Sequence, residues 1–174
     1  MKNILVRSAV PTDAQGFLDL WEVLDSETEF MLFEPGERKI AFDEQKKRLE
    51  RSVDSDNIAM FVLEDPLQAI LAGFAAGFRN TNFRDNHKLH LVIGLRQRYT
   101  GKGLGSKLLD SIEEWALQRS IRRLELSVIV TNNRAIQLYK RHQFETEGTR
   151  KDSVQLKSGF VDEYVMGKLL EMRD

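Results

Sequence analysis

Three glycines alternate with other residues in the segment Tyr99–Gly105, which reads Tyr-Thr-Gly-Lys-Gly-Leu-Gly. The segment lies between an apolar run, Leu89–Leu95, and an amphipathic run, Leu104–Arg119, so we expect it to join a strand to a helix. Glycine lets the main chain adopt positive φ angles and lets a ligand approach it, and the free N–H groups at a helix start attract an anion. The segment therefore predicts a site for a phosphorylated ligand.

Two common phosphate-binding loops do not fit the spacing of these glycines. A P-loop needs Ser or Thr after Gly-Lys, but Lys102 is followed by Gly103. A dinucleotide fingerprint, G-x-G-x-x-G, that starts at Gly101 would need its third glycine at Ser106. Nucleoside triphosphates and NAD are therefore minor alternatives, and a plain connecting turn is the structural alternative to an anion site.

Composition limits the class of protein. The chain has 174 residues, which suits one domain over residues 1–174. Its 26 basic and 27 acidic side chains nearly cancel, so no overall field favours nucleic acid or a membrane surface. There is no cysteine, and the three histidines lack metal-ligand spacing, so no metal site is expected. No apolar run suits a signal peptide or a membrane span, and we expect a cytoplasmic protein.

The glycine segment must be positioned by the elements around it. Apolar runs and turn residues predict strands at 4–8, 58–64, 69–79, 88–95, 123–130, 144–151 and 161–168. Helices are expected to begin near Ala14, Asp43, Leu104 and Asn132, with irregular segments at 25–38 and 152–160. This order predicts an α/β protein, with a mixed, mostly antiparallel sheet of about seven strands flanked by about four helices.

A second motif follows the strand expected at 123–130. It reads Asn132-x-x-Ala135-Ile136-x-Leu138-Tyr139-x-x-x-x-Phe144 and resembles a motif of the GNAT superfamily of acetyl-CoA-dependent N-acetyltransferases. The glycine segment is similar to that family's Gln/Arg-x-x-Gly-x-Gly/Ala signature, with Gly103 and Gly105 as its glycines. The sequence departs from the family pattern at Thr100, where Gln or Arg is usual, and at Gln143, where Gly is usual. The resemblance covers nearly the whole chain.

The resemblance implies a GNAT fold in which the fourth and fifth strands splay apart to admit acetyl-CoA as cosubstrate, without a metal. Main-chain N–H groups of residues 100–105 would hold the pyrophosphate, while Leu95 and Arg96 would hold the pantetheine arm. Gly94 suits either a bulge or a tightly packed core position. The expected cofactor-binding residues are Gly94, Leu95, Arg96, Thr100, Gly101, Lys102, Gly103, Leu104, Gly105, Ser106, Asn132 and Tyr139.

The same resemblance makes Tyr139 the general acid that assists the departing thiolate after an amine attacks the thioester directly in a ternary complex. Ordinary pKa values make complete proton transfer from a tyrosine to a thiolate uphill by roughly 2 kcal/mol, so a strengthening hydrogen bond is expected instead. Some relatives use a Glu as the general base at the position where this chain has Ser127. Glu125 on the same strand and His90 on the preceding one are the candidate bases.

The acceptor is expected to enter over the irregular segment at 25–38, helped by the loop at 152–160. Acidic residues there suggest a cationic amine, and Phe30, Glu34 and Glu37 are the candidate acceptor-binding residues. The sequence thus predicts an N-acetyltransferase that acts on a primary amine of a small molecule or protein, with a homodimer as its assembly. A non-catalytic acyl-CoA sensor on the same fold and a generic nucleotide-binding domain are the alternatives.

Overall fold

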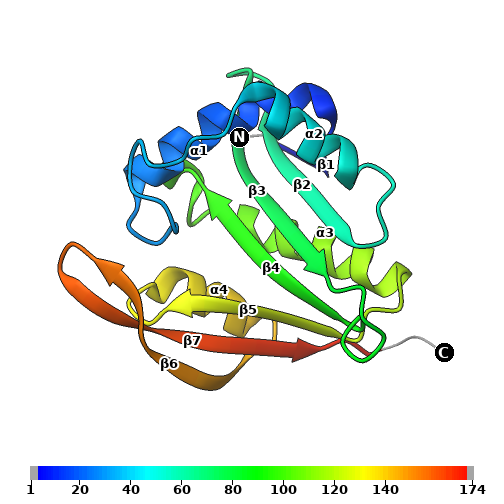
Figure 1. Ribbon diagram of the computed structural model, residues 1–174, viewed down its shortest axis with the longest axis vertical. Helices are drawn as coiled ribbons and strands as arrows, with labels where there is room; N and C mark the ends of the chain where they lie inside the picture. The colour runs from blue at the N-terminus through cyan, green and yellow to red at the C-terminus, as the bar shows by residue number, and fades with distance from the viewer. Residues whose placement is uncertain (1–3, 172–174) are drawn as a thin grey trace.

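The computed structural model describes residues 4–171, and its centre is a seven-stranded sheet (Figure 1). The sheet has the order β1-β2-β3-β4-β5-β7-β6, and every neighbouring pair is antiparallel except β4 and β5, which are parallel. The mixed, mostly antiparallel sheet with four α-helices confirms the predicted fold class. The strands are β1 (Leu5–Ser8), β2 (Ile58–Asp65), β3 (Ile70–Arg79), β4 (Lys88–Leu95), β5 (Arg123–Ile129), β6 (Glu145–Leu156) and β7 (Gly159–Leu169).

The helices cover the two faces of the sheet and create two cores (Figure 1). On one face lie α1 (Ala14–Glu27), preceded by the 3-10 turn η1 (Pro11–Asp13), and α2 (Phe42–Ser52). On the other lie α3 (Leu104–Gln118), preceded by the 3-10 turn η2 (Gln97–Tyr99), and α4 (Asn133–Arg141). No helix within residues 4–171 is long and apolar enough to cross a membrane.

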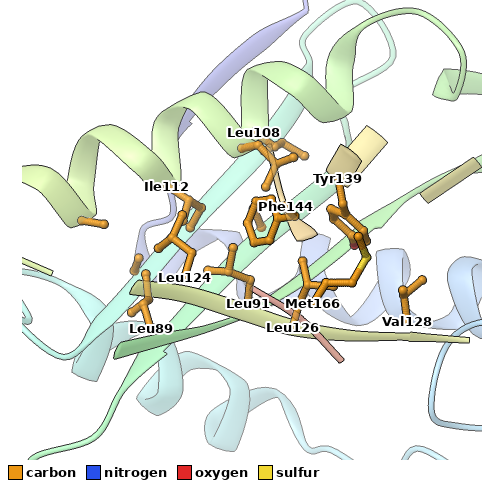
Figure 2. Packing of buried hydrophobic residues seen from close by; sticks show 14 of the residues in the cluster. Leu89, Leu91, Leu108, Ile112, Leu124, Leu126, Val128, Tyr139, Phe144 and Met166 are labelled. Atoms are coloured by element: carbon orange, nitrogen blue, oxygen red, sulfur yellow. The ribbon is translucent and has the colours of Figure 1, made fainter. Parts of the chain in front are cut away.

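The larger core forms because α3 and the strands below it each present an apolar face. Leu108 and Ile112 are one turn apart on α3, and both are fully buried in the cluster that also contains Leu89 and Leu124 of the sheet (Figure 2). Alternation along β5 directs Leu124, Leu126 and Val128 to this core, so the residues between them face the side of α1. One face of β5 therefore packs into the core beneath α3, and the other face lies on the side of α1.

An ion-pair network fixes the start of the chain. Arg7 of β1 contacts Asp13 of η1 at 2.8 Å and Glu64 of β2 at 2.6 Å, and the main-chain N–H of Val10 donates to the Asp13 carboxylate at 2.8 Å. Burial alone raises the pKa of Asp13, but the hydrogen bonds from Arg7 and Val10 outweigh it and hold the pKa below its usual value. The start of α1 is thereby attached to the edge of the sheet.

The strands β4 and β5 pair over only part of their length. Their register runs from Lys88↔Arg123 to His90↔Glu125 and stops there, although β4 continues to Leu95 and β5 to Ile129. Figure 1 shows the two strands meeting at one end and diverging toward the other. The predicted splay is confirmed, and beyond His90 the two strands leave an opening in the sheet.

The prediction of an irregular loop at 152–160 is wrong, because β6 and β7 extend through it as a long hairpin. The register includes Val154↔Val161, Gln155↔Phe160 and Leu156↔Gly159, which leaves only two residues between the strands. Side chains of β6 are exposed along most of the strand, and in the missed segment only Val154 and Leu156 alternate with exposed polar residues. Two apolar positions are too short a run to identify a half-buried strand from the sequence.

Candidate active site

The three alternate glycines have different structural roles. Gly101 and Gly103 adopt φ angles of +73° and +75° with open space where a Cβ would stand, so the turn itself needs glycine there. Gly105 lies inside α3, where a Cβ would come within 2.9 Å of Leu138 on α4. The first two glycines shape the loop, and the third lets the two helices approach closely.

The loop ends at a helix start whose main-chain donors are open. The first hydrogen bond across this boundary runs from Lys107 N–H to Gly103 O at 3.3 Å, and a helix leaves its first N–H groups without partners inside the helix. Those of Leu104, Gly105 and Ser106 therefore have no partner inside the helix, directly after the glycine turn, and such a helix start suits an anion.

Thr100 does not belong to this set of main-chain donors, because its N–H donates to Gln97 O at 3.1 Å. The expectation for its N–H group is therefore wrong. The Thr100 hydroxyl donates to the same carbonyl at 2.7 Å and accepts a hydrogen bond from Arg134 of α4. Arg134 thereby brings a guanidinium to the loop. Sequence reasoning missed it, although it stands two residues after Asn132 in the second motif.

A buried hydrogen bond attaches the loop to the end of β2. Tyr99 directly precedes Thr100. Its hydroxyl donates a hydrogen bond to the Asp65 carboxylate at 2.6 Å and accepts one from Arg98 at 2.9 Å. The Asp65 carboxylate also accepts main-chain N–H groups of Leu67 and Gln68. The hydrogen bond from Tyr99 is the main cause that lowers the pKa of Asp65. Nothing in the sequence pattern relates these positions, because 34 residues separate them.

The edge of β4 that faces the opening carries unpaired main-chain groups. In the ladder with β3, Arg96 N–H bonds to Ala72 O at 2.9 Å, and ladder alternation then directs Gly94 toward β3 and the main chain of Ile93 and Leu95 toward β5. Because pairing with β5 has ended, the groups of Ile93 and Leu95 face the opening. Arg96 N–H is bonded to β3 and does not face the opening, whereas its buried Nε has no hydrogen-bond partner within residues 4–171. Contacts of Arg96 with the pantetheine arm stay a prediction.

Gly94 does not form a bulge. The β3–β4 register continues without a shift from Gly73↔Leu95 to Arg79↔Leu89. A Cβ at Gly94 would lie 2.6 Å from Phe74 Cε1 and 2.9 Å from Leu24 Cδ1. The bulge is therefore a wrong prediction, and Gly94 is the tightly packed core position that was its alternative.

Tyr139 points from α4 into the core below the opening. It is 7% exposed, its ring centroid lies 5.8 Å from that of Phe144, and Figure 2 shows it in the same layer as Met166 and Leu126. Burial raises the pKa of Tyr139 to about 12. The hydroxyl therefore remains a hydrogen-bond donor throughout the neutral range.

Asn132 has the capping role that its type predicts. Its side chain accepts a hydrogen bond from Ala135 N–H at 3.2 Å, which fixes the start of α4 at Asn133, four residues after β5 ends at Ile129. The position of Tyr139 depends on where α4 begins, because Asn132 caps the short helix that carries Tyr139.

The two candidate bases lie beside each other. His90 and Glu125 form the last register pair before β4 and β5 part, on the face opposite the core of α3. His90 is exposed. Glu125 accepts from Arg123 at 3.1 Å, and Arg123 also pairs with Glu147 of β6. The structure thus gathers both groups at the closed end of the opening.

A cleft of about 390 Å³ separates the segment after α1 from the end of β6. Glu34 and Glu37 line it, whereas Phe30 is not among its lining residues. Glu34 forms an ion pair with Lys157 across the cleft at 3.0 Å, and Asp25, also in the lining, is bound by Arg38 at 2.8 Å. Two of the five acidic residues in the segment 25–38, Asp25 and Glu34, are therefore already in ion pairs. No group of His, Cys, Asp or Glu side chains that suits a metal ion occurs in the described part of the chain.

Comparison with known proteins gives one family. Residues 18–144 match the Acetyltransferase (GNAT) family. The crystal structure of a GNAT-family acetyltransferase from Streptococcus pneumoniae is 31% identical, with 97% of this chain and 100% of that chain covered and a TM-score of 0.91. The structure of yncA from Salmonella typhimurium with acetyl-CoA is 17% identical, with 99% and 96% covered and a TM-score of 0.83, which shows a shared fold.

Two curated relatives match shorter segments. The L-amino acid N-acetyltransferase AaaT of Escherichia coli is 33% identical over 87 residues, which is 49% of this chain and 54% of that protein. The thialysine N-epsilon-acetyltransferase of Bos taurus is 40% identical over 48 residues, or 28% of each chain. The matches thus span about half or less of the length of these relatives.

Proposed function

Because the chain belongs to the GNAT acetyltransferase family, we propose that it transfers an acetyl group from acetyl-CoA to a primary amine of a small molecule or protein. The observation that carries the proposal is the parting of β4 and β5 beside the start of α3. An open strand edge suits an arm that contains amide groups, and a helix start with free N–H groups suits a diphosphate.

Acetyl-CoA fits the residues present. The positive-φ turn of Gly101 and Gly103 leaves the main chain open to a close approach, and the Arg134 guanidinium adds positive charge beside it. The buried Nε of Arg96, without a partner in the described chain, is a further donor at the end of β4. When bound, acetyl-CoA supplies an acetyl thioester whose C–S bond breaks as the C–N bond to the amine forms.

In this proposal Tyr139 donates a hydrogen bond to the departing sulfur, and a base takes the proton that the attacking amine must lose. Glu125 and His90 are the candidates for the base, directly or through a water molecule, because they lie side by side where the strands part. Comparison of pH–rate profiles for the wild type, His90→Gln and Glu125→Gln tests both. Identical acidic limbs in all three profiles would dismiss them.

The acceptor is proposed to reach the thioester from the face of α1, over the cleft that Glu34 and Glu37 line. A cationic group there would compete with Lys157 for Glu34, and exposed ion pairs of this kind are weak. The relatives named for acetylation of L-amino acids and thialysine support an amino compound as acceptor. An acceptor KM that is indifferent to Glu34→Gln and Glu37→Gln would count against the cleft.

The first experiment is thiol release from acetyl-CoA across a panel of amino acids, polyamines, aminoglycosides and peptides. Calorimetry with acetyl-CoA, CoA, ATP and NAD accompanies it. Release with some acceptors supports the transferase. Binding of acetyl-CoA without release from any acceptor would favour the sensor alternative, and preferential binding of ATP or NAD would favour the nucleotide-binding domain.

A further inference from the structure

The acceptor face of the sheet carries, close to the opening, an arginine that has no ion-pair partner within residues 4–171. Ser127 is the first residue of β5 beyond the last register pair whose side chain faces this side. Its hydroxyl accepts a hydrogen bond from Arg150 of β6 at 3.2 Å. A strand two positions away in the sheet therefore brings a guanidinium to the place where β4 and β5 part.

A second arginine on the same face provides a contrast. Arg123 is held between two carboxylates, those of Glu125 and Glu147. Arg150 has no ion pair within residues 4–171, although Glu163 of β7 is its register partner. The Glu163 carboxylate instead accepts from the Ser153 hydroxyl at 2.6 Å. The positive charge of Arg123 is neutralised, whereas that of Arg150 remains available to a ligand.

The chemistry of a guanidinium defines the group that it would bind. Arginine presents a planar set of N–H donors that matches a carboxylate with two parallel hydrogen bonds. Among the residues that the structure describes, the side-chain partner of Arg150 is the neutral hydroxyl of Ser127. The carboxylate of an acceptor would give Arg150 a charged partner instead. An α-amino acid has its amine and its carboxylate on one carbon, so a carboxylate held beside Ser127 keeps the amine next to the opening.

We propose that Arg150 binds the carboxylate of the acceptor and thereby selects amines that carry a carboxylate on the same carbon, as α-amino acids do. This inference rests on the proposed acetyl transfer. The end of the same strand, Val154–Leu156, and the following turn residue Lys157 line the acceptor cleft. One strand thus supplies both a contact for the carboxylate and a wall for the rest of the acceptor.

The test compares the standard L-amino acids with their amides in the thiol-release assay, with kcat/KM corrected for the unprotonated fraction of each amine. The amide keeps the amine and the side chain but removes the negative charge. We expect the wild type to prefer the best amino acid over its amide by about 10- to 100-fold, the range of a charge-assisted hydrogen bond. In Arg150→Gln this preference disappears, while kcat/KM for the amide and KM for acetyl-CoA stay within about twofold.

Lys151→Gln is the matched control, because the next residue along the strand faces the other side and pairs with Asp162 at 2.7 Å. It removes one positive charge nearby and should keep the full preference. Equal use of amino acids and amides by the wild type, or a preference that survives in Arg150→Gln, would overturn the role of Arg150 and leave acetyl transfer intact. Absence of thiol release with every amine would instead overturn the proposed function, and this inference with it.

Discussion

Replacement of Tyr139 by phenylalanine separates a chemical role of its hydroxyl from a packing role. The ring is buried and contacts Phe144, and phenylalanine fills almost the same volume. Desolvation is the cause of the raised pKa of Tyr139, about 12, and no hydrogen bond within the described chain offsets it. Removal of the hydroxyl should therefore change the free energy of unfolding by no more than about 1 kcal/mol.

The same pKa sets the form of catalysis that Tyr139 can provide. Complete proton transfer from a group with a pKa of about 12 to the thiolate of a thiol near ~8.5 is uphill by about 5 kcal/mol. Burial thus more than doubles the cost that ordinary pKa values predict. The hydroxyl can still donate a hydrogen bond that strengthens as charge develops on sulfur, and loss of one such donor lowers kcat by about 10²- to 10³-fold.

The assay is thiol release at saturating acetyl-CoA with the best acceptor from the panel, together with calorimetric affinity for CoA and a thermal melt. We expect Tyr139→Phe to lose about 10²- to 10³-fold in kcat with an unchanged melting temperature and unchanged CoA affinity. A kcat within about threefold of wild type would remove the hydroxyl from the mechanism. A parallel fall in melting temperature would assign the effect to packing.

Three further predictions concern the scaffold around the site. Gly94→Ala should lower the free energy of unfolding by about 1–3 kcal/mol because its Cβ would meet Phe74 and Leu24, whereas Gly148→Ala, with nothing within 4 Å, should be close to neutral in the same denaturant titration. Tyr99→Phe removes the hydrogen bond to Asp65 and should raise the KM for acetyl-CoA by about tenfold without a matching loss of kcat; an unchanged KM would show that this bond does not position the loop. Because Asp13 has a lowered pKa when folded, its ion pair stabilises the fold above the ordinary carboxyl pKa and is lost as pH falls through the folded value. Asp13→Asn should therefore lower the melting temperature at neutral pH, with the deficit shrinking below about pH 4, and a deficit of constant size would contradict the linkage.

The elements that the sequence identifies well are those with a strong local pattern. The apolar stripe of α3 and the alternation in β5 each record one buried face, so their positions follow from periodicity. The hairpin of β6 and β7 lacks such a pattern along most of β6, because β6 lies at the edge of the sheet and most of its side chains are exposed. Its extent depends on cross-strand pairing, which a pattern in one strand does not encode.

The candidate site divides in the same way. The turn of Gly101 and Gly103 is a local conformational requirement, and its residue types predict it. The attachment of Tyr99 to Asp65 and the contact of Arg150 with Ser127 join positions 34 and 23 residues apart. The role of Gly94 depends on two neighbours from other elements, Phe74 and Leu24. These features arise only when the sheet is assembled. Sequence reasoning therefore could not decide between the two roles of Gly94, and it had no local signal for the two hydrogen bonds.

The proposed cofactor side and the proposed acceptor side of the site differ in how many substitutions they tolerate. The proposed cofactor contacts come chiefly from main-chain groups and from glycines whose conformation or packing excludes other residues, so that side of the site tolerates few changes. Arg150 and most of its neighbours on β6 are exposed, and substitutions at such positions usually change stability by less than about 0.5 kcal/mol. On the proposed assignment, acceptor preference can therefore change through exposed side chains of β6 and of the segment that carries Glu34 and Glu37, while the opening between β4 and β5 and the glycine turn stay as they are.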